Sequence, residues 1–171
     1  TLLLRSGNCA GPLGYSGSTS AFNIANDGAL IVAADFSGNG DCSFQGASVT
    51  DDAGNHTIVA GAPNGITPEG ALATEAGFED LDGLAMDGAG NLYLSEKTLH
   101  TVLRVDAETG LVSTLMGSSG NAGSSGDFGP SEQARLNGPR DLGVTADGHL
   151  VIWEYDNRSI RMIWDVENWE P

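Results

Sequence analysis

A stretch of this chain recurs after 58 residues, and this internal repeat constrains the fold more than any other feature of the sequence. Self-similarity at a fixed period is the signature of repeat architectures, in which each unit is one supersecondary structure. A third, weaker copy lies upstream, where Leu30 precedes Leu92 by 62 residues, and the loop that contains Cys42 can hold the additional length. The pairs matched at the offset of 58 are Ala76 and Ala134, Phe78 and Leu136, Leu84 and Leu142, and Leu92 and Leu150.

Each unit contains four short segments of strand character, separated by residues that favour turns. In the second unit these segments are 84–87, 91–95, 101–105 and 111–116. The intervening glycine, aspartate and asparagine residues supply positive φ angles or bond their own backbone. Strands at this spacing with such turns predict antiparallel meanders, and only 130–134 has the character of a helical turn.

A four-stranded antiparallel meander that recurs along a chain is typical of a β-propeller blade. A single blade leaves both of its faces open, so blades must stack around a common axis. The sequence therefore predicts an all-β fold of about three blades within one segment, residues 1–171. The expected parts are an outer strand at 1–5, a blade at 20–61, a blade at 82–117 and a partial blade at 139–165.

Residues 126–163 resemble an NHL repeat, a unit of one β-propeller family. The family pattern has a Gly-Asp-Gly-Gly-Pro-Ala loop, then Leu-x-x-Pro, an Asp-Gly-Asn-Leu-Tyr-Val strand and an Asn-x-x-Ile-Arg strand. Here the corresponding stretches are 126–139, 147–152 and 157–163, while residues 76–116 match more loosely and residues 20–61 weakly. Within 126–139, Ala134 and Leu136 are expected to fill the space between neighbouring blades.

The resemblance implies a six-bladed ring, and three blades supply only half of one. Either the chain is part of a longer polypeptide, which is the plainer interpretation, or two copies assemble. The N-terminal segment Leu2–Arg5 has the character of an outermost strand, and the last predicted blade lacks that strand. Two copies could therefore exchange this strand and remove each other's open edges. Both interpretations stay open at this point.

The formal charge is −16, from 23 acidic and 7 basic residues. A polyanion repels phosphate backbones and anionic membranes, so a nucleic-acid partner is not expected. Cations or a basic partner match this charge better, although a highly solvated surface is the simpler explanation. No run approaches the roughly 18 apolar residues of a membrane span.

Cys9 and Cys42 are predicted to form a disulfide. In a meander, the loop that enters a blade lies on the same face as the loop between its second and third strands, and these two loops contain the two cysteines. Such a bridge would stabilise the fold by about 3–4 kcal/mol on the chain-entropy model. It would also indicate an oxidising compartment, extracellular or periplasmic.

A binding site is hypothesised on that same face. The second strand of each blade ends in a carboxylate, at Asp35, Glu96 and Glu154, and Asp127 and Asp156 lie in neighbouring loops. Clustered carboxylates could bind a Ca²⁺-type cation, although no EF-hand pattern is present and no other cofactor is expected. The alternative is that these carboxylates accept hydrogen bonds from backbone amides in turns.

No catalytic constellation is evident in the sequence. His56 and His149 are expected near the opposite face and His100 at the start of a third strand, so the three histidines do not converge. No nucleophile elbow or phosphate-binding loop is present. An aromatic group near the C-terminus suggests packing against a blade or an adjoining chain, with sugar stacking as the alternative. Its members are Trp153, Tyr155, Trp164 and Trp169.

The function expected from these observations is a non-catalytic, extracytoplasmic propeller module for protein–protein interaction or complex assembly. Its partner would be another protein, a second copy, or the rest of the propeller. One alternative is part of a lyase- or hydrolase-like propeller enzyme whose catalytic residues lie outside this chain. Another is a carbohydrate-binding propeller. A fold by itself supports none of these choices.

Overall fold

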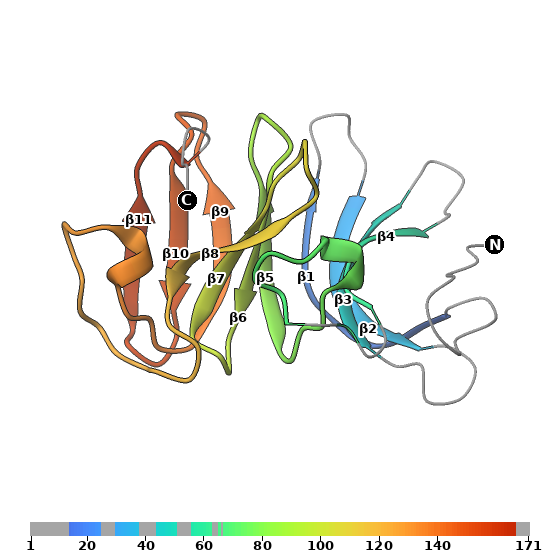
Figure 1. The fold of residues 1–171 in the computed structure, drawn as a ribbon, viewed down its shortest axis with the longest axis horizontal. Coiled ribbons are helices and arrows are strands. Elements are labelled where there is room, and N and C mark those ends of the chain that lie inside the picture. Colours follow the sequence, from blue (N-terminus) through green and yellow to red (C-terminus); the bar gives the residue numbers. More distant parts are fainter. Residues whose placement is uncertain are drawn as a thin grey trace.

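The computed structural model of the chain describes residues 14–24, 30–37, 44–50, 56–62, 65 and 67–166. These residues form eleven β-strands and two 3-10 turns, drawn in Figure 1. Among them no helix is long enough to cross a membrane. The strands are β1 (Gly14–Ile24), β2 (Leu30–Ser37), β3 (Phe44–Thr50), β4 (His56–Ala60), β5 (Leu81–Met86), β6 (Leu92–Glu96), β7 (Thr101–Val105), β8 (Val112–Gly117), β9 (Pro139–Val144), β10 (Leu150–Glu154) and β11 (Ser159–Ile163); the 3-10 turns are η1 (Ala73–Glu75) and η2 (Ser131–Gln133).

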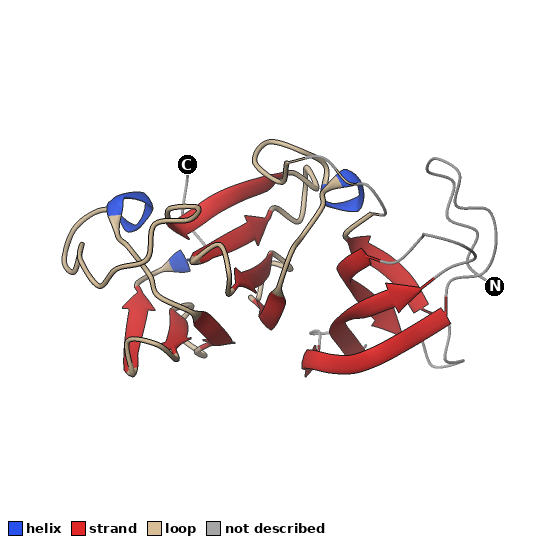
Figure 2. Ribbon diagram, turned by 90° about the horizontal axis from the view of Figure 1, so that it is seen from below, coloured by secondary structure: helices blue, strands red, loops and turns tan. Residues whose placement is uncertain are grey.

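The strands form three antiparallel meanders, which we call blades 1, 2 and 3. Blade 1 has the order β1-β2-β3-β4 and blade 2 the order β5-β6-β7-β8, whereas the described residues of blade 3 form β9-β10-β11. The first strands of the three blades are neighbours, with β5 between β1 and β9, and the blades fan out from them (Figures 1 and 2). The predicted all-β fold of antiparallel blades is therefore confirmed. The outer strand predicted at 1–5 lies outside the described residues.

Blades 2 and 3 repeat each other with a constant offset of 58 residues. Strands β5, β6 and β7 correspond to β9, β10 and β11, and η1 corresponds to η2, each pair with identical length and the same offset. The left-handed backbone positions also repeat, because Gly70 (φ 74°) corresponds to Phe128 (φ 64°) and His100 (φ 58°) to Arg158 (φ 54°). The turn geometry is therefore conserved between the blades even where the residue is not glycine.

Two apolar clusters hold the blades together. The first joins blades 1 and 2 and contains Ile31 and Ala47 from blade 1 and Leu84 and Leu94 from blade 2. The second joins blades 2 and 3, and Ala134 (1% exposed) and Leu136 (0% exposed) lie within it. This confirms that these two residues fill the space between neighbouring blades. The other buried members of the second cluster are Ala85, Tyr93, Val102, Leu115, Met116, Leu150, Ile152, Ile163 and Val166.

Candidate functional site

Glu96, at the end of β6, is buried inside blade 2 and is fully withdrawn from solvent (0% exposed). Its Oε1 accepts the Glu79 amide at 3.0 Å and its Oε2 accepts the Asp80 amide at 3.1 Å. Burial raises the pKa of this carboxyl, and the two backbone amides act in the opposite direction. The carboxylate thus anchors the chain segment that leads into β5.

Glu154, at the end of β10, has the same role in blade 3. It is fully buried, and its Oε2 accepts the Asn137 amide at 2.8 Å and the Asn157 side-chain amide at 2.7 Å. The Arg161 guanidinium lies 3.9 Å from its Oε1. The Glu79 and Asn137 amides are separated by the repeat offset, so the two glutamates bind equivalent turns in blades 2 and 3. This arrangement matches the turn-acceptor alternative for Glu96 and Glu154.

The described acidic residues of the hypothesised binding site do not form one cluster, although Arg161 contacts both Asp127 and Glu154. Asp127 is exposed and forms a 2.6 Å ion pair with Arg161. Asp156 lies in the turn between β10 and β11, against Gly138. Asp35 is in β2, opposite Gln45, and its side chain is not among those described. Within the described part of the chain, no three histidine, cysteine or acidic side chains lie close enough together to hold a metal ion.

The predicted disulfide cannot be located in the structure, since Cys9 and Cys42 lie outside the described residues. Two of the histidines bond backbone amides. His100 Nδ1 accepts the Gly138 amide at 3.1 Å, and His149 Nδ1 accepts the Asp165 amide at 3.1 Å. These two histidines are at opposite ends of the strands, which fits the expectation that they do not converge.

A charged group lies where the inner strands of blades 2 and 3 begin. Arg140 Nε is 2.6 Å from Asp82 Oδ2, and the guanidinium carbon lies 4.9 Å from the centre of the Tyr155 ring. The ion pair raises the pKa of Arg140 further above its ordinary value. Tyr155 is half exposed and stacks on the Arg140 guanidinium, so the pair offers an aromatic surface beside a cation whose charge Asp82 balances.

The surface of blade 3 that faces away from blade 2 is apolar and exposed. Trp153 on β10 is 43% exposed, and its cross-strand neighbour Ile160 on β11 is 65% exposed. Such a patch of large apolar side chains is typical of an interaction surface. We call it the open face of blade 3; it consists of Asp141, Gly143, Val151, Trp153, Ile160 and Met162.

The corresponding surface of blade 2 is completely covered. At the repeat offset, Trp153 corresponds to Ser95 and Ile160 to Val102, and both residues of blade 2 are 0% exposed. Blade 3 covers them, since Ser95 Oγ donates to the Arg140 carbonyl at 2.8 Å and Val102 packs in the second apolar cluster. A further blade would therefore pack on the open face of blade 3, as blade 3 packs on blade 2.

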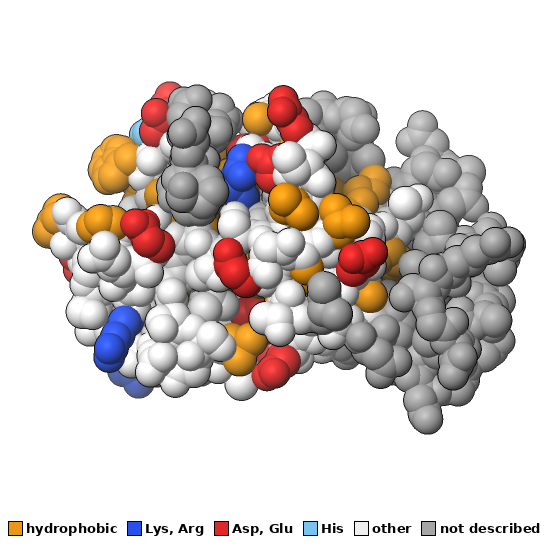
Figure 3. All heavy atoms as spheres, viewed as in Figure 1, with side chains coloured by type: hydrophobic (Ala, Val, Ile, Leu, Met, Phe, Trp, Pro, Cys, Tyr) orange, Lys and Arg blue, Asp and Glu red, His pale blue; other side chains and the backbone are white. Residues whose placement is uncertain are grey.

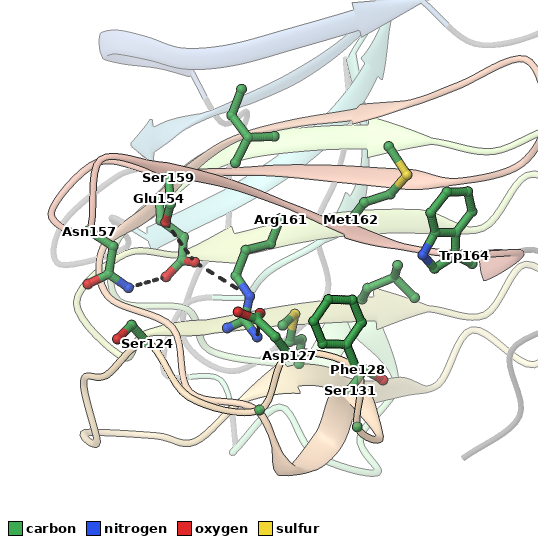
Figure 4. Close-up of a pocket in the computed structure, with 15 residues that line it drawn as sticks. Ser124, Asp127, Phe128, Ser131, Glu154, Asn157, Ser159, Arg161, Met162 and Trp164 are labelled. Carbon is green, nitrogen blue, oxygen red and sulfur yellow. Dashed lines mark hydrogen bonds and ion pairs between the residues drawn. The ribbon is translucent and has the colours of Figure 1, made fainter.

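A cavity of about 870 Å³ lies beside β11, as shown in Figure 4. Asp127 and Phe128 lie on one wall, and Met162 and Trp164 lie on the opposite wall (Figure 4). Phe128 (110% exposed) and Trp164 (72% exposed) make this region unusually apolar for a surface. Asp127 was predicted from the sequence as a binding residue, whereas the cavity was not predicted. The sequence prediction assigned no fourth strand to the last blade, and this gap was the signal that could have located the cavity.

Figure 3 shows the distribution of side chains on one face of the molecule. Acidic side chains are spread over this face and basic ones are few, in keeping with the charge of −16. A dispersed negative charge favours solubility and gives no localised site for an anion. Among the described residues, the distinctive surfaces are thus the open face and the β11 cavity.

No protein-family model matches the chain, and no curated protein does. A solved structure similar to it is a structural genomics protein of unknown function from Bacteroides thetaiotaomicron, with a TM-score of 0.66 and 23% identity over 80% of this chain and 32% of that chain. Two others are auxiliary nutrient binding proteins. The one from Bacteroides thetaiotaomicron has a TM-score of 0.57 and 17% identity over 82% of this chain and 36% of that chain. The one from Bacteroides ovatus has a TM-score of 0.54 and 12% identity over 92% and 60%.

These likenesses concern the fold. Together with the three antiparallel sheets, they establish that the described residues form part of a β-propeller. The chain spans about a third of the length of the first two similar structures, at 32% and 36%.

Proposed function

We propose that this chain is a non-catalytic β-propeller module that assembles with a partner carrying further blades, either a second copy of the chain or another protein. The observation that supports this proposal is the open face of blade 3, with Trp153, Ile160 and Met162 all more than 40% exposed. Blade 2 needs blade 3 to bury the equivalent surface, and blade 3 needs an equivalent partner. Burial of this apolar surface would provide the driving force for assembly.

The proposal extends to family and location. The segment 126–163 carries the NHL-like pattern, so we place the chain among NHL-type propellers. The paired positions predicted for Cys9 and Cys42 favour an extracellular or periplasmic location, because disulfides persist in oxidising compartments. An acidic surface favours a partner that is neutral or basic where it approaches outside the apolar contact.

A second candidate function is the binding of a small nutrient. Two structures of similar fold are described as auxiliary nutrient binding proteins. In this chain the exposed Tyr155 ring stacked on Arg140 is a surface that could stack on a sugar. A glycan array with the Tyr155→Ala variant as control would test this function. An enzymatic role would need catalytic groups from blades outside this chain, and elemental analysis for bound metal is its simplest test.

Assembly between copies is tested by the mass of the chain in solution. Light scattering should give a mass well above the 17.5 kDa of one chain. Trp153→Glu places a charge in the centre of the open face and should return the chain to the mass of a monomer. Leu111→Glu is the matched control, since Leu111 is 42% exposed but lies on the turn before β8. A wild-type chain of 17.5 kDa at high concentration would refute assembly between copies.

A further inference from the structure

The segment that leads into blade 2 forms a backbone pairing with the last strand of that blade. The Gly70 amide donates to the Val112 carbonyl at 2.8 Å, and the Val112 amide donates to the Ala71 carbonyl at 2.8 Å. Glu69 Oε2 additionally accepts the amide and the hydroxyl of Thr114, both at 2.7 Å. Strand β8 therefore lies between two partners, β7 on one side and residues 69–73 on the other.

The segment that leads into blade 3 has the same left-handed residue, but within the described part of the chain it has no such partner. Asp127, Phe128 and Gly129 lie at the repeat offset from Glu69, Gly70 and Ala71, and Phe128 keeps the left-handed backbone of Gly70. Among the described residues, none bonds the Phe128 amide or the Gly129 carbonyl. β11 lies at the edge of its sheet. The β11 cavity lies between these two unpaired stretches of backbone, where a fourth strand would fit.

The chain that follows β11 turns away from this cavity. In blade 2 the turn 106–110 reverses the chain so that β8 returns along β7. In blade 3 the Val166 amide instead donates to the Gly148 carbonyl at 2.8 Å, and the Val166 carbonyl faces the Tyr93 hydroxyl at 3.4 Å. Val166 is fully buried there. Val166 and its contacts therefore lie against blade 2 and not along the edge of β11.

We propose that the N-terminal segment Leu2–Arg5 of a second copy enters the β11 cavity as the fourth strand of blade 3. The inference rests on the proposed function, since it requires two copies to assemble, and it adds the segment and the site. The inserted strand would pair with β11 on one side and with Phe128 and Gly129 on the other, as β8 does in blade 2. Exposed Phe128, Met162 and Trp164 would pack on its apolar side chains.

The second copy is a better donor than the same chain. Blade 2 lies between β1 and β11, so the N-terminal segment of the same chain would have to pass around it (Figures 1 and 2). A second copy whose blade 1 packs on the open face of blade 3 brings its own N-terminal segment to β11 directly. Residues 6–13 precede β1, and eight extended residues span about 26 Å. The width of a four-stranded sheet from first to last strand is about 14 Å, so the segment is long enough.

The experiment uses full-length chains that carry single added cysteines. Donor chains carry Leu2→Cys, Leu3→Cys or Leu4→Cys, and the acceptor chain carries Met162→Cys. Each donor is mixed with the acceptor, oxidised mildly and analysed without reducing agent for a covalent dimer. Leu111→Cys is the control acceptor, since Leu111 has the same exposure as Met162 (42% and 41%) but lies on blade 2.

A covalent dimer should form in the mixtures with Met162→Cys and exceed that with Leu111→Cys at least several-fold. Because alternate side chains of a strand point to opposite faces, Leu2→Cys and Leu4→Cys should behave alike and Leu3→Cys differently. Equal yields at all three donors, or equal yields with the control acceptor, would overturn strand insertion.

Light scattering on the same chains separates the two proposals. A dimer by mass that gives no specific cross-link retains the proposed function and overturns this inference. A monomer by mass overturns this inference and assembly between copies. A single chain with Leu3→Cys and Met162→Cys that closes an internal bridge while the mixtures give none would show that the donor is not a second copy.

Discussion

At the scale of single residues, the glutamates that end β6 and β10 stabilise turns inside the fold. Glu96 is buried with two backbone amides as its donors, and burial raises its pKa above the ordinary value of 4.5. A carboxyl whose pKa is higher in the folded than in the unfolded chain stabilises the fold below the unfolded value. That contribution is lost as the pH rises through the folded pKa. Glu96 therefore makes the chain relatively less stable at neutral pH than at pH 4.

The variant Glu96→Gln tests this behaviour. Glutamine does not ionise, so the free energy of unfolding of wild type relative to the variant should fall as the pH rises above 4.5. The variant also loses one acceptor for the Asp80 amide, at a cost of about 1–3 kcal/mol that does not depend on pH. Urea unfolding of both chains at pH 4 and pH 7 measures the difference, with exposed Glu108→Gln as the control. A difference independent of pH would contradict the raised pKa.

At the scale of elements, the covered face of blade 2 and the open face of blade 3 differ in the space available to a side chain. A Cβ on Gly83 would lie 2.9 Å from Ser95 Oγ and 2.9 Å from the Arg140 carbonyl carbon, and closer still to the Arg140 oxygen. On Gly143, in β9, a Cβ would meet nothing within 4 Å. An added methyl group would therefore clash on the covered face of blade 2 and fit without contact on the open face of blade 3.

Gly83→Ala should destabilise the chain by about 1–3 kcal/mol, because β5 and β9 would have to separate. Gly143→Ala should be neutral or stabilise the chain by up to about 1 kcal/mol, since alanine is favoured over glycine in a strand. Urea unfolding of the two variants measures both effects. Equal destabilisation would mean that the open face is already covered within one chain. The equivalent of Gly143 in blade 2 is Ala85, which shows that a methyl group is compatible with a packed blade.

The sequence was sufficient to predict the strands but not the contacts between distant segments. The pairs Phe78/Leu136 and Leu92/Leu150 revealed the repeat, because alternating apolar residues and turn residues are local signals. The burial of Glu96 and Glu154 was not predictable in this way, since isolated glutamates are usually exposed. Likewise, the pairing of Gly70 with Val112 involves only backbone atoms of residues far apart in the sequence. The pattern of side chains along the sequence therefore does not indicate this pairing.

At the scale of the whole molecule, the open face and the net charge act against each other. Burial of Trp153, Ile160 and Met162 favours assembly of two copies. Each copy carries a formal charge of −16, and two such chains repel each other over the Debye length. The assembled state therefore combines a short-range apolar attraction with a longer-range repulsion, and only the repulsion is strongly reduced by salt.

Assembly between copies should accordingly strengthen with salt. At about 0.05 M salt the Debye length is longer than 10 Å, and at about 0.5 M it falls to a few ångströms. The apparent dissociation constant should decrease by roughly tenfold over this range, equivalent to about 1.4 kcal/mol. Light scattering across a dilution series measures it, with Trp153→Glu expected to stay monomeric at every salt concentration. If assembly weakened with salt, attraction between opposite charges would dominate the interface, and the apolar open face of blade 3 would not be the principal contact.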